Sequence, residues 1–392
     1  EFPGPRGSEA ARMGKKRTGA VELPEPLVQA ITAALQGPTT VKTVRDEVKR
    51  MAEVLSTTAG VAIQPQYQVV WGEREALAYA SAYSPGAYAA VHNVLSEVRG
   101  RMDGPEPWAP RRVLDFGCGP GTATWAVENV WSDGGVEEVR GVDVSEPMLT
   151  MAQNIHRGFQ DSMPDGPKTT FHRFLSYSSQ PESYDLVVAS YVLGDLVDDQ
   201  TRVKTLRELW DRTGEVLVLI ERGTPEGFRA LESMRSTLLG SRTGAHILGP
   251  CPHEGTCPMA GTTKWCHFPQ RVQRPPFTMQ AKGGSRKNWE DRKYSYLILR
   301  RGARPGSAHP PKAEEVRLGQ GGLEGGKALW DASWAWPRVI DAPMKRDGHV
   351  LLDTCVRDGH LERIIIPKSQ GKVPYYDARK TRWGDLFPHA PK

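Results

Sequence analysis

The sequence predicts an α/β fold built on a doubly wound, mostly parallel sheet. Two observations lead to this prediction. Apolar runs typical of buried strands alternate with amphipathic helical stretches from residue 112 to about residue 240. A glycine-rich turn joins the first of these strands to the helix that follows it. Such units connect through right-handed crossovers, so we expect ligands at the carboxyl ends of the strands.

The glycine-rich turn lies in the stretch RVLDFGCGPGT over residues 112–122. Gly117, Gly119 and Gly121 form a GxGxG pattern at positions where side chains would obstruct a ligand. Backbone N–H groups of such a turn face an anionic or polar ligand. The dinucleotide pattern GxGxxG needs a glycine at the position of Thr122, so the turn differs from that of NAD enzymes.

Two acidic residues accompany this turn. Asp115 lies within the first strand, and Asp143 ends the second strand, predicted over 138–143. A carboxylate in the second position suits the two hydroxyls of a ribose. Together, the turn and the acids resemble motif I and the second-strand acid of the class I methyltransferases, which use S-adenosylmethionine. An ordinary strand–turn–helix corner is the alternative interpretation.

The other elements follow from hydrophobic periodicity. Helical spacing predicts two helices within 24–57 and a helical pair over 73–102, broken at Ser84-Pro85-Gly86. A continuous apolar run predicts the fourth strand, and Ser190 and Tyr191 at its carboxyl end are expected to line the cofactor site. Ser145 is a candidate N-cap. The remaining expected elements are strands at 169–174, 184–190, 214–221 and 294–301, and helices at 201–212 and 228–239.

Composition and charge restrict the class of protein. The chain has 392 residues, 39% of them hydrophobic, and lacks an apolar run long enough to span a membrane. The net charge is +5, and ten Lys and Arg residues fall within 271–304 against two acids. Such a block points to a polyanion, most plausibly RNA, with a solvated charged loop as the alternative.

Regular alternation stops at Gly249, where three cysteines follow within sixteen residues. Two of them precede prolines, and the stretch has no pattern of a helix or strand, so a metal centre is expected to replace the missing core. Thiolates suit structural zinc and an iron–sulfur cluster equally well. The wide spacing favours the larger centre slightly, while unligated structural cysteines remain the alternative. The candidate ligands are Cys251, Cys257 and Cys266, with a fourth from Cys355, His253 or His267.

The C-terminal part reads as a small β extension followed by a basic and aromatic end over 375–385. Cations mixed with aromatic rings can bind phosphates and stack on bases, although a solvated terminus is an equal alternative.

Several motifs resemble the mitochondrial small-ribosomal-subunit assembly factors of the methyltransferase-like protein seventeen family, with its yeast and bacterial relatives. The matching segments are LDFGCGPGT at 114–122, CPHEGTCPM at 251–259, WCHFPQRVQR at 265–274, KYSYLILRR at 293–301, and KSQGK with DARKTRWGDLFP near the end. The resemblance covers most of residues 70–388.

The resemblance implies a fold that binds S-adenosylmethionine, and a 4Fe–4S cluster on Cys251, Cys257, Cys266 and Cys355. It also implies a monomer that contacts rRNA and ribosomal proteins of the small subunit during its maturation in the mitochondrial matrix, and no membrane. Catalytic turnover is doubtful, because the position after strand four lacks the Asn/Asp-Pro-Pro-aromatic motif of amino-methylating enzymes. An active rRNA methyltransferase is one alternative, and a zinc-stabilised RNA-binding scaffold without cofactor is another.

These features predict a domain organisation. Residues 1–20 are expected to be unstructured or a targeting or tag remnant, because the first residue is Glu1 and the stretch is basic. The remaining parts are an N-terminal helical region at 21–110, the methyltransferase-like domain at 111–248, the cysteine-rich and basic region completing the sheet at 249–304, a flexible insert at 305–328 and the β extension at 329–392.

Overall fold

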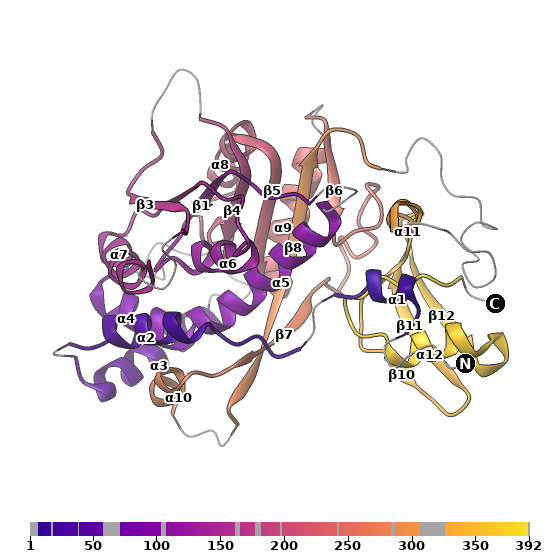
Figure 1. The fold of residues 1–392 in the computed structure, drawn as a ribbon, viewed down its shortest axis with the longest axis horizontal. Coiled ribbons are helices and arrows are strands. Elements are labelled where there is room, and N and C mark those ends of the chain that lie inside the picture. The colour runs from indigo at the N-terminus through magenta and orange to yellow at the C-terminus, as the bar shows by residue number, and fades with distance from the viewer. Residues whose placement is uncertain are drawn as a thin grey trace.

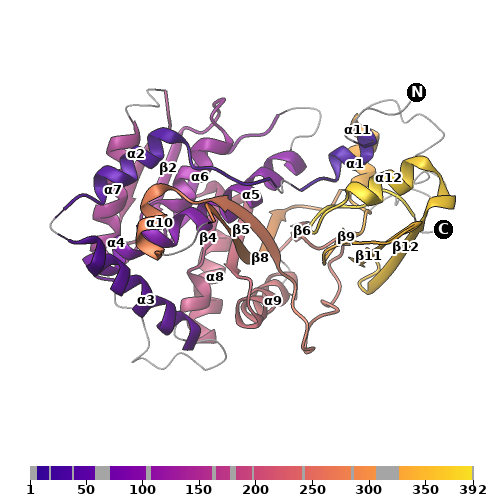
Figure 2. The ribbon, with the colours of Figure 1, turned by 90° about the horizontal axis from the view of Figure 1, so that it is seen from below.

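A computed structural model describes residues 7–16, 19–37, 39–57, 71–102, 107–160, 165–176, 182–196, 198–240, 243–283, 287–305 and 326–390. These residues form a larger lobe around an eight-stranded sheet and a smaller lobe around a four-stranded sheet (Figure 1). Figure 2 shows the lobes side by side, with the short helices α1 and α11 lying against the smaller lobe. Within the described ranges, no helix is long and apolar enough to cross a bilayer.

The larger sheet has the strand order β3-β2-β1-β4-β5-β8-β6, with β7 paired to β8 outside this path. β1 to β5 are parallel to one another, and β8 runs antiparallel between β5 and β6. This order confirms the predicted α/β fold of a class I methyltransferase. The strands are β1 (Arg112–Phe116), β2 (Glu138–Val142), β3 (Lys168–His172), β4 (Tyr184–Ser190), β5 (Thr213–Arg222), β6 (Ala245–Gly249), β7 (Phe268–Gln273) and β8 (Trp289–Arg301).

Helices cover both faces of this sheet, so its central strands are buried on both sides. Successive residues of a strand point to opposite faces; Val218 lies in one core and Leu219 in the other. The first core includes α2 (Glu25–Ala34), α5 (Ser84–Met102), α6 (Thr122–Val130) and α7 (Glu146–Gln160). The second core includes α8 (Asp199–Asp211) and α9 (Pro225–Gly240).

A side cluster extends the larger lobe. It contains α3 (Val41–Thr57), α4 (Glu73–Ala82) and α10 (Pro276–Lys282), packed through buried residues such as Met51 and Ala281. β7 and β8 form an antiparallel ribbon next to it, and Val21 adds a parallel bridge to Val272. The basic stretch 271–304 therefore begins within the strand β7.

The smaller lobe is an antiparallel sheet with α12 (Lys372–Lys380) packed on it. Its core contains Val350, Ile364, Ala378 and Phe387. α1 (Glu9–Met13) and α11 (Gly326–Ser333) share a small apolar cluster with Leu386. The strands are β9 (Arg338–Val339), β10 (Met344–Lys345), β11 (His349–Cys355) and β12 (Leu361–Pro367).

A buried ionic group on α5 joins the two lobes. The Glu97 carboxylate accepts hydrogen bonds from Arg338 Nη2 at 2.6 Å and from Tyr296 Oη at 2.7 Å, and it pairs with Lys16 Nζ. Burial would raise the pKa of Glu97, but Arg338 and Lys16 hold it well below its usual range. Glu97 thus connects the N-terminal segment, the central sheet and the smaller lobe.

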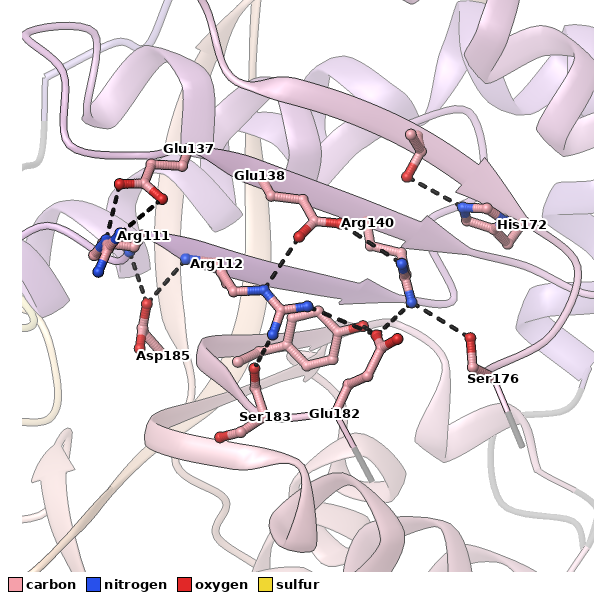
Figure 3. Close-up of polar contacts among 12 residues, drawn as sticks. Arg111, Arg112, Glu137, Glu138, Arg140, His172, Ser176, Glu182, Ser183 and Asp185 are labelled. Carbon is pink, nitrogen blue, oxygen red and sulfur yellow. Dashed lines mark hydrogen bonds and ion pairs between the residues drawn. The ribbon is translucent and has the colours of Figure 1, made fainter. Parts of the chain in front are cut away.

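The amino-terminal edge of the larger sheet carries an ion-pair network (Figure 3). Arg112 pairs with Glu138 at 3.1 Å, and Arg140 pairs with Glu182 at 2.5 Å. Asp185 accepts hydrogen bonds from the backbone N–H groups of residues 111 and 112 at 2.8 and 2.9 Å. These partly exposed pairs stabilise the edge modestly and leave the carboxyl ends of the strands as the edge for ligands.

Several elements differ from the predictions. Residues 7–16 hold α1 and the buried Lys16, so this part of 1–20 is docked and not unstructured. The break in the helical pair falls at Tyr83, and Ser84-Pro85-Gly86 begin α5. Most of the predicted insert at 305–328 lies outside the described residues. The sequence analysis did not predict β6, β7, α10, α11 or α12.

Candidate functional site

The glycine turn is held in a conformation that favours glycine. Gly117, Gly119 and Gly121 have φ values of 70°, 52° and 97°. A Cβ atom at Gly117 would lie 2.5 Å from Val192, whereas one at Gly119 would meet no atom within 4 Å. Gly117 therefore allows the chain after β4 to approach, and the space beside Gly119 is open.

Asp143 is fixed next to this turn at the carboxyl end of β2. Its Oδ2 accepts from the Gly119 N–H, and its Oδ1 accepts from the Ser145 N–H, both at 2.9 Å. Burial raises the pKa of Asp143, which the two N–H groups oppose. Each oxygen keeps a lone pair for a further donor such as a hydroxyl. Ser145 also caps α7 as predicted, because its Oγ accepts from the Met148 N–H at 3.3 Å.

Asp115 has a different environment. It is fully buried, and its Oδ2 accepts from the N–H and the Oγ1 of Thr124, both at 2.9 Å. Burial raises the pKa of Asp115 to about 7. This carboxyl group thus anchors the first turn of α6, and its predicted contact with a cofactor stays a prediction.

Tyr191, at the end of β4, has a positive φ of 58°, which is uncommon for a residue with a side chain. Its N–H donates to the Ile220 carbonyl at 2.7 Å, and its ring lies 5.0 Å from the Arg292 guanidinium. Ser190 directly precedes it in β4. The structure thus places the predicted pair at the carboxyl edge of β4, the strand next to β1.

Charged residues that the sequence analysis did not single out lie at the same edge. Arg222, the last residue of β5, forms a two-point ion pair with Asp195 at 2.7 and 3.1 Å. Glu221 accepts from the Gly194 N–H at 2.8 Å, and burial with the nearby Asp195 raises its pKa to about 7. An acid–base pair ending an apolar strand was the signal that could have identified them.

The four predicted metal ligands line one cavity between α9, the loop after β6 and the smaller lobe. Cys355 comes from β11, about ninety positions after the other three, and its Sγ lies 3.4 Å from His253 Nε2. The tertiary structure therefore brings these distant thiols to a common space. The thiols belong to Cys251, Cys257, Cys266 and Cys355.

Three arginines hold the loop that carries the first two cysteines. Arg235 donates to the carbonyls of His253 and Gly255 at 3.2 and 2.6 Å. Arg304 donates to the Pro252 carbonyl at 2.9 Å, and Arg338 donates to the Pro250 carbonyl at 3.0 Å. Side-chain donors thus satisfy carbonyls of a partly buried loop that lacks regular backbone pairing.

The same arginines alter the electrostatics of the thiols. Burial raises the pKa of Cys355 to about 12 and the pKa of Cys266 well above its usual value, in each case against an opposing effect of Arg338. Arg235 also lowers the pKa of Cys355. Metal ligation needs thiolates, and the buried guanidinium groups supply positive charge that would balance them.

The described residues contain no group of three or more His, Cys, Asp or Glu side chains arranged to hold a single metal ion. A tetrahedral ion with bonds of about 2.3 Å requires sulfurs roughly 3.8 Å apart. The four thiols line one cavity, but this does not require them to be as close together as a single ion needs. A multi-iron cluster would bond each thiolate to a different iron. The metal assignment therefore stays a prediction.

The basic block does not form one positive face. Most of its described members bind groups within the protein: Arg271 pairs with Asp291, Lys282 with Glu290, and Arg301 with the backbone of α8 and β5. Lys287 and Lys293 are exposed. The density of basic residues in sequence thus overstated the positive surface.

Comparison with known proteins decides the family. The model described as "Mitochondrial small ribosomal subunit Rsm22" matches residues 73–388, which is most of the chain. The chain belongs to the Rsm22 family. Within the Rsm22 family, it is 30% identical to the human mitochondrial ribosome assembly protein METTL17 over 330 residues. It is 32% identical to the mitochondrial Rsm22-cox11 tandem proteins of Schizosaccharomyces pombe and 24% identical to the mitochondrial ribosome assembly protein RSM22 of Saccharomyces cerevisiae.

These matches cover 78–82% of the chain but only 43% of the tandem proteins, 64% of METTL17 and 65% of RSM22. All of these relatives are named as mitochondrial proteins, which confirms the mitochondrial location that the motif resemblance implied for the family. The solved magnesium protoporphyrin IX methyltransferase of Synechocystis PCC 6803 is 15% identical, with a TM-score of 0.33 over 68% of this chain and all of that one. The fold is therefore assigned from the strand order and not from this likeness.

Proposed function

We propose that this protein is an assembly factor of the mitochondrial small ribosomal subunit that binds rRNA. In this proposal the methyltransferase-like sheet binds S-adenosylmethionine, and Cys251, Cys257, Cys266 and Cys355 hold a 4Fe–4S cluster. Membership of the Rsm22 family supports the assembly role. The observation that carries the proposal is the convergence of four thiols on one cavity flanked by three arginines.

Two features favour a cluster over four unligated cysteines. Thiols that only filled a core would need no counter-charge, yet Arg235 and Arg338 are almost fully buried beside them. The thiols also come from the loop after β6, the segment just before β7 and the distant β11, so ligation would tie the larger lobe to the smaller one. Zinc remains the competing metal.

The carboxyl edge of the larger sheet supports the cofactor proposal. Asp143 presents two oriented oxygens next to the open space at Gly119. The oxygens are suited to a ribose, and the glycine turn would accept the rest of a nucleoside. Ser190 and Tyr191 would line the other side of this site, which the sequence analysis predicted for them.

Binding of rRNA is best supported on the smaller lobe. Lys345, Arg379 and Arg382 are exposed. Partial burial lowers the pKa of Lys345, and the nearby charges of Arg379 and Arg382 contribute to the shift, so the three cations lie close together. Exposed Tyr376 on α12 adds an aromatic surface. We name this the α12 basic surface; it comprises Lys345, Arg346, Lys372, Arg379, Lys380 and Arg382.

An active rRNA methyltransferase is the second candidate function. Asp195 is an acid at this edge that could serve as a base, but Arg222 binds both of its oxygens. That pairing favours a carboxylate that orients neighbouring groups over one that accepts a proton from a substrate. We therefore propose cofactor binding without assigning a catalytic residue.

The deciding experiment is anaerobic purification followed by iron, sulfide and zinc analysis and visible absorbance. We expect iron and sulfide in equal amounts, with loss of both in Cys257→Ser. The matched control is Cys118→Ser, because Cys118 lies buried in the glycine turn and not in the cysteine cavity. Zinc without iron would refute the 4Fe–4S cluster and would favour the alternative of a zinc-stabilised RNA-binding scaffold.

The rRNA and methyl-transfer proposals need a separate assay. Purified protein is incubated with labelled S-adenosylmethionine and immature small-subunit RNA. We expect RNA binding without stoichiometric methyl incorporation. Incorporation that is lost in Asp143→Ala would instead establish the methyltransferase.

A further inference from the structure

A second cavity lies where residues 13–16, α5 and α11 meet. Its charged lining consists of four cations and one carboxylate, which gives a positive excess. Three of the cations are buried, so this excess is not spread over an open surface. The charged residues are Lys15, Lys16, Arg101, Arg338 and Glu97.

The single carboxylate is already shared. Glu97 pairs with Lys16 through one oxygen and with Arg338 through the other. Asp385 lies nearby and accepts from the Lys16 N–H at 2.9 Å, but it is not part of the lining. Glu97 also acts on Arg101 at longer range, but no carboxylate in the described ranges forms an ion pair with Arg101.

Arg101 is the buried cation of this lining that has no ion-pair partner among the described residues. Arg101 is only 9% exposed, and its Nε donates a hydrogen bond to the Leu248 carbonyl at 2.8 Å. Its guanidinium lies 4.3 Å from the Trp334 ring. Among the described residues, no acceptor or ion-pair partner is found for its two terminal nitrogens. Burial and, secondarily, the nearby charge of Arg338 lower the pKa of Arg101 to about 9.

We propose that this cavity binds a phosphate-type oxyanion, with Arg101 as its principal ligand. A guanidinium offers two parallel N–H donors that match phosphate oxygens. Lys15 on the rim and the spare N–H groups of Lys16 and Arg338 add positive charge around the same space. An anion would remove the uncompensated charge that burial makes costly.

The oxyanion has two possible sources, free inorganic phosphate or a backbone phosphate of RNA. Only the second source rests on the proposed function. Direct binding of inorganic phosphate therefore tests the site itself, and it can succeed even if the protein does not bind rRNA.

The test is titration of the purified full chain with inorganic phosphate at constant ionic strength, followed by calorimetry and thermal unfolding. We expect saturable binding that raises the melting temperature of the wild-type protein. Arg101→Gln should weaken binding roughly tenfold or more, because a hydrogen-bonded charge is lost. Lys204→Gln, which removes an exposed lysine of α8, should bind as the wild type does.

A second variant, at the rim of the cavity, keeps the proposal testable if Arg101→Gln does not fold. Lys15→Gln changes an exposed residue and should weaken phosphate binding by a few-fold without altering stability. Absence of saturable binding to the wild type would overturn the proposal. Equal affinity of the wild type, Lys15→Gln and a folded Arg101→Gln would overturn it as well.

An RNA competition distinguishes the two sources. If phosphate displaces bound RNA and Arg101→Gln weakens both ligands, an RNA phosphate occupies the cavity. If phosphate binds without displacing RNA, the ligand is a free anion. Both results support the site and identify its occupant.

Discussion

Two carboxyl groups flank the glycine turn, and their surroundings give them different properties. Asp143 receives backbone N–H groups on both oxygens, whereas Asp115 receives donors on one oxygen only. The other oxygen of Asp115 is buried and has no partner among the described residues. The first residue is thus prepared to accept ligand hydroxyls, and the second favours the protonated form.

The raised pKa of Asp115 predicts a pH-dependent stability. A carboxyl group that binds its proton more tightly in the folded state lowers stability as pH rises from about 4 to about 7. Asp115→Asn should remove this loss. Its free energy of unfolding, relative to wild type, should rise between about pH 5 and about pH 8 by an amount on the order of a few kcal/mol. Urea denaturation measures the difference, and parallel curves would contradict the pKa assignment.

Asp143 should be needed for cofactor binding. Asp143→Ala removes both oriented oxygens, so we expect at least a roughly tenfold loss of affinity for S-adenosylmethionine. Isothermal titration calorimetry measures this loss. Glu146→Gln changes a nearby exposed carboxylate at the start of α7 and is the matched control. Unchanged affinity in Asp143→Ala would place the cofactor elsewhere.

At the scale of elements, the loop after β6 and the strand β11 form one unit. The loop has no regular structure, and side chains from α9, β9 and the segment after β8 satisfy its carbonyls. β11 brings Cys355 to the same cavity. Such a loop is ordered by its surroundings, which explains why local sequence patterns do not predict its conformation.

Cys355→Ser tests whether β11 contributes a ligand. We expect the variant to lose metal as completely as Cys257→Ser, because a cluster needs each of its thiolates. Metal analysis after anaerobic purification measures this. Retention of metal would show that a histidine, such as the neighbouring His253, replaces the thiol.

At the scale of the whole molecule, one buried carboxylate connects three parts of the chain. Glu97 on α5 binds Lys16 of the N-terminal segment and Arg338 of the smaller lobe, and it also accepts from Tyr296 on β8. Arg338 lines the cysteine cavity and the proposed anion cavity as well. The relative position of the lobes thus depends on charges that meet only after folding.

Glu97→Gln should weaken the junction of the lobes. It leaves two buried cations without a counter-charge, which costs roughly 3–5 kcal/mol. Urea denaturation should show the loss, and limited proteolysis should cleave the N-terminal segment faster. Wild-type stability and proteolysis in this variant would show that apolar packing alone holds the lobes together.

RNA binding also belongs to the scale of the whole molecule, because the α12 basic surface and the β7–β8 ribbon are separate places where RNA could bind. Arg379→Gln with Lys380→Gln should flatten the salt dependence of RNA affinity by about 0.7 in slope for each lost phosphate contact with a single strand. The control pair Lys287→Gln with Lys293→Gln carries the same charge change on the β7–β8 ribbon, and we expect a smaller effect. A larger effect of the control pair would move the RNA surface to that ribbon.

The sequence by itself determined the parallel strands of the larger sheet and the glycine turn at their carboxyl edge. Local patterns set these features, because continuous apolar runs form central strands and positive φ angles favour glycine at the turn. The bounds of β4 agreed with the predicted 184–190, as did the cap of α7 by Ser145. Motif resemblance added the Rsm22 family, which the comparisons confirmed.

Only the tertiary structure decided which distant side chains meet. The sequence analysis could name Cys355 but could not show that it lines the same cavity as Cys257. The sequence also does not reveal that Arg101 is buried without an ion-pair partner in the described part of the chain. The sequence analysis also counted the cations of 271–304 as surface, whereas most of the described ones bind acids or carbonyls nearby. The physical reason is that pairing of charges and convergence of thiols depend on contacts between segments far apart in the chain, which no local periodicity encodes.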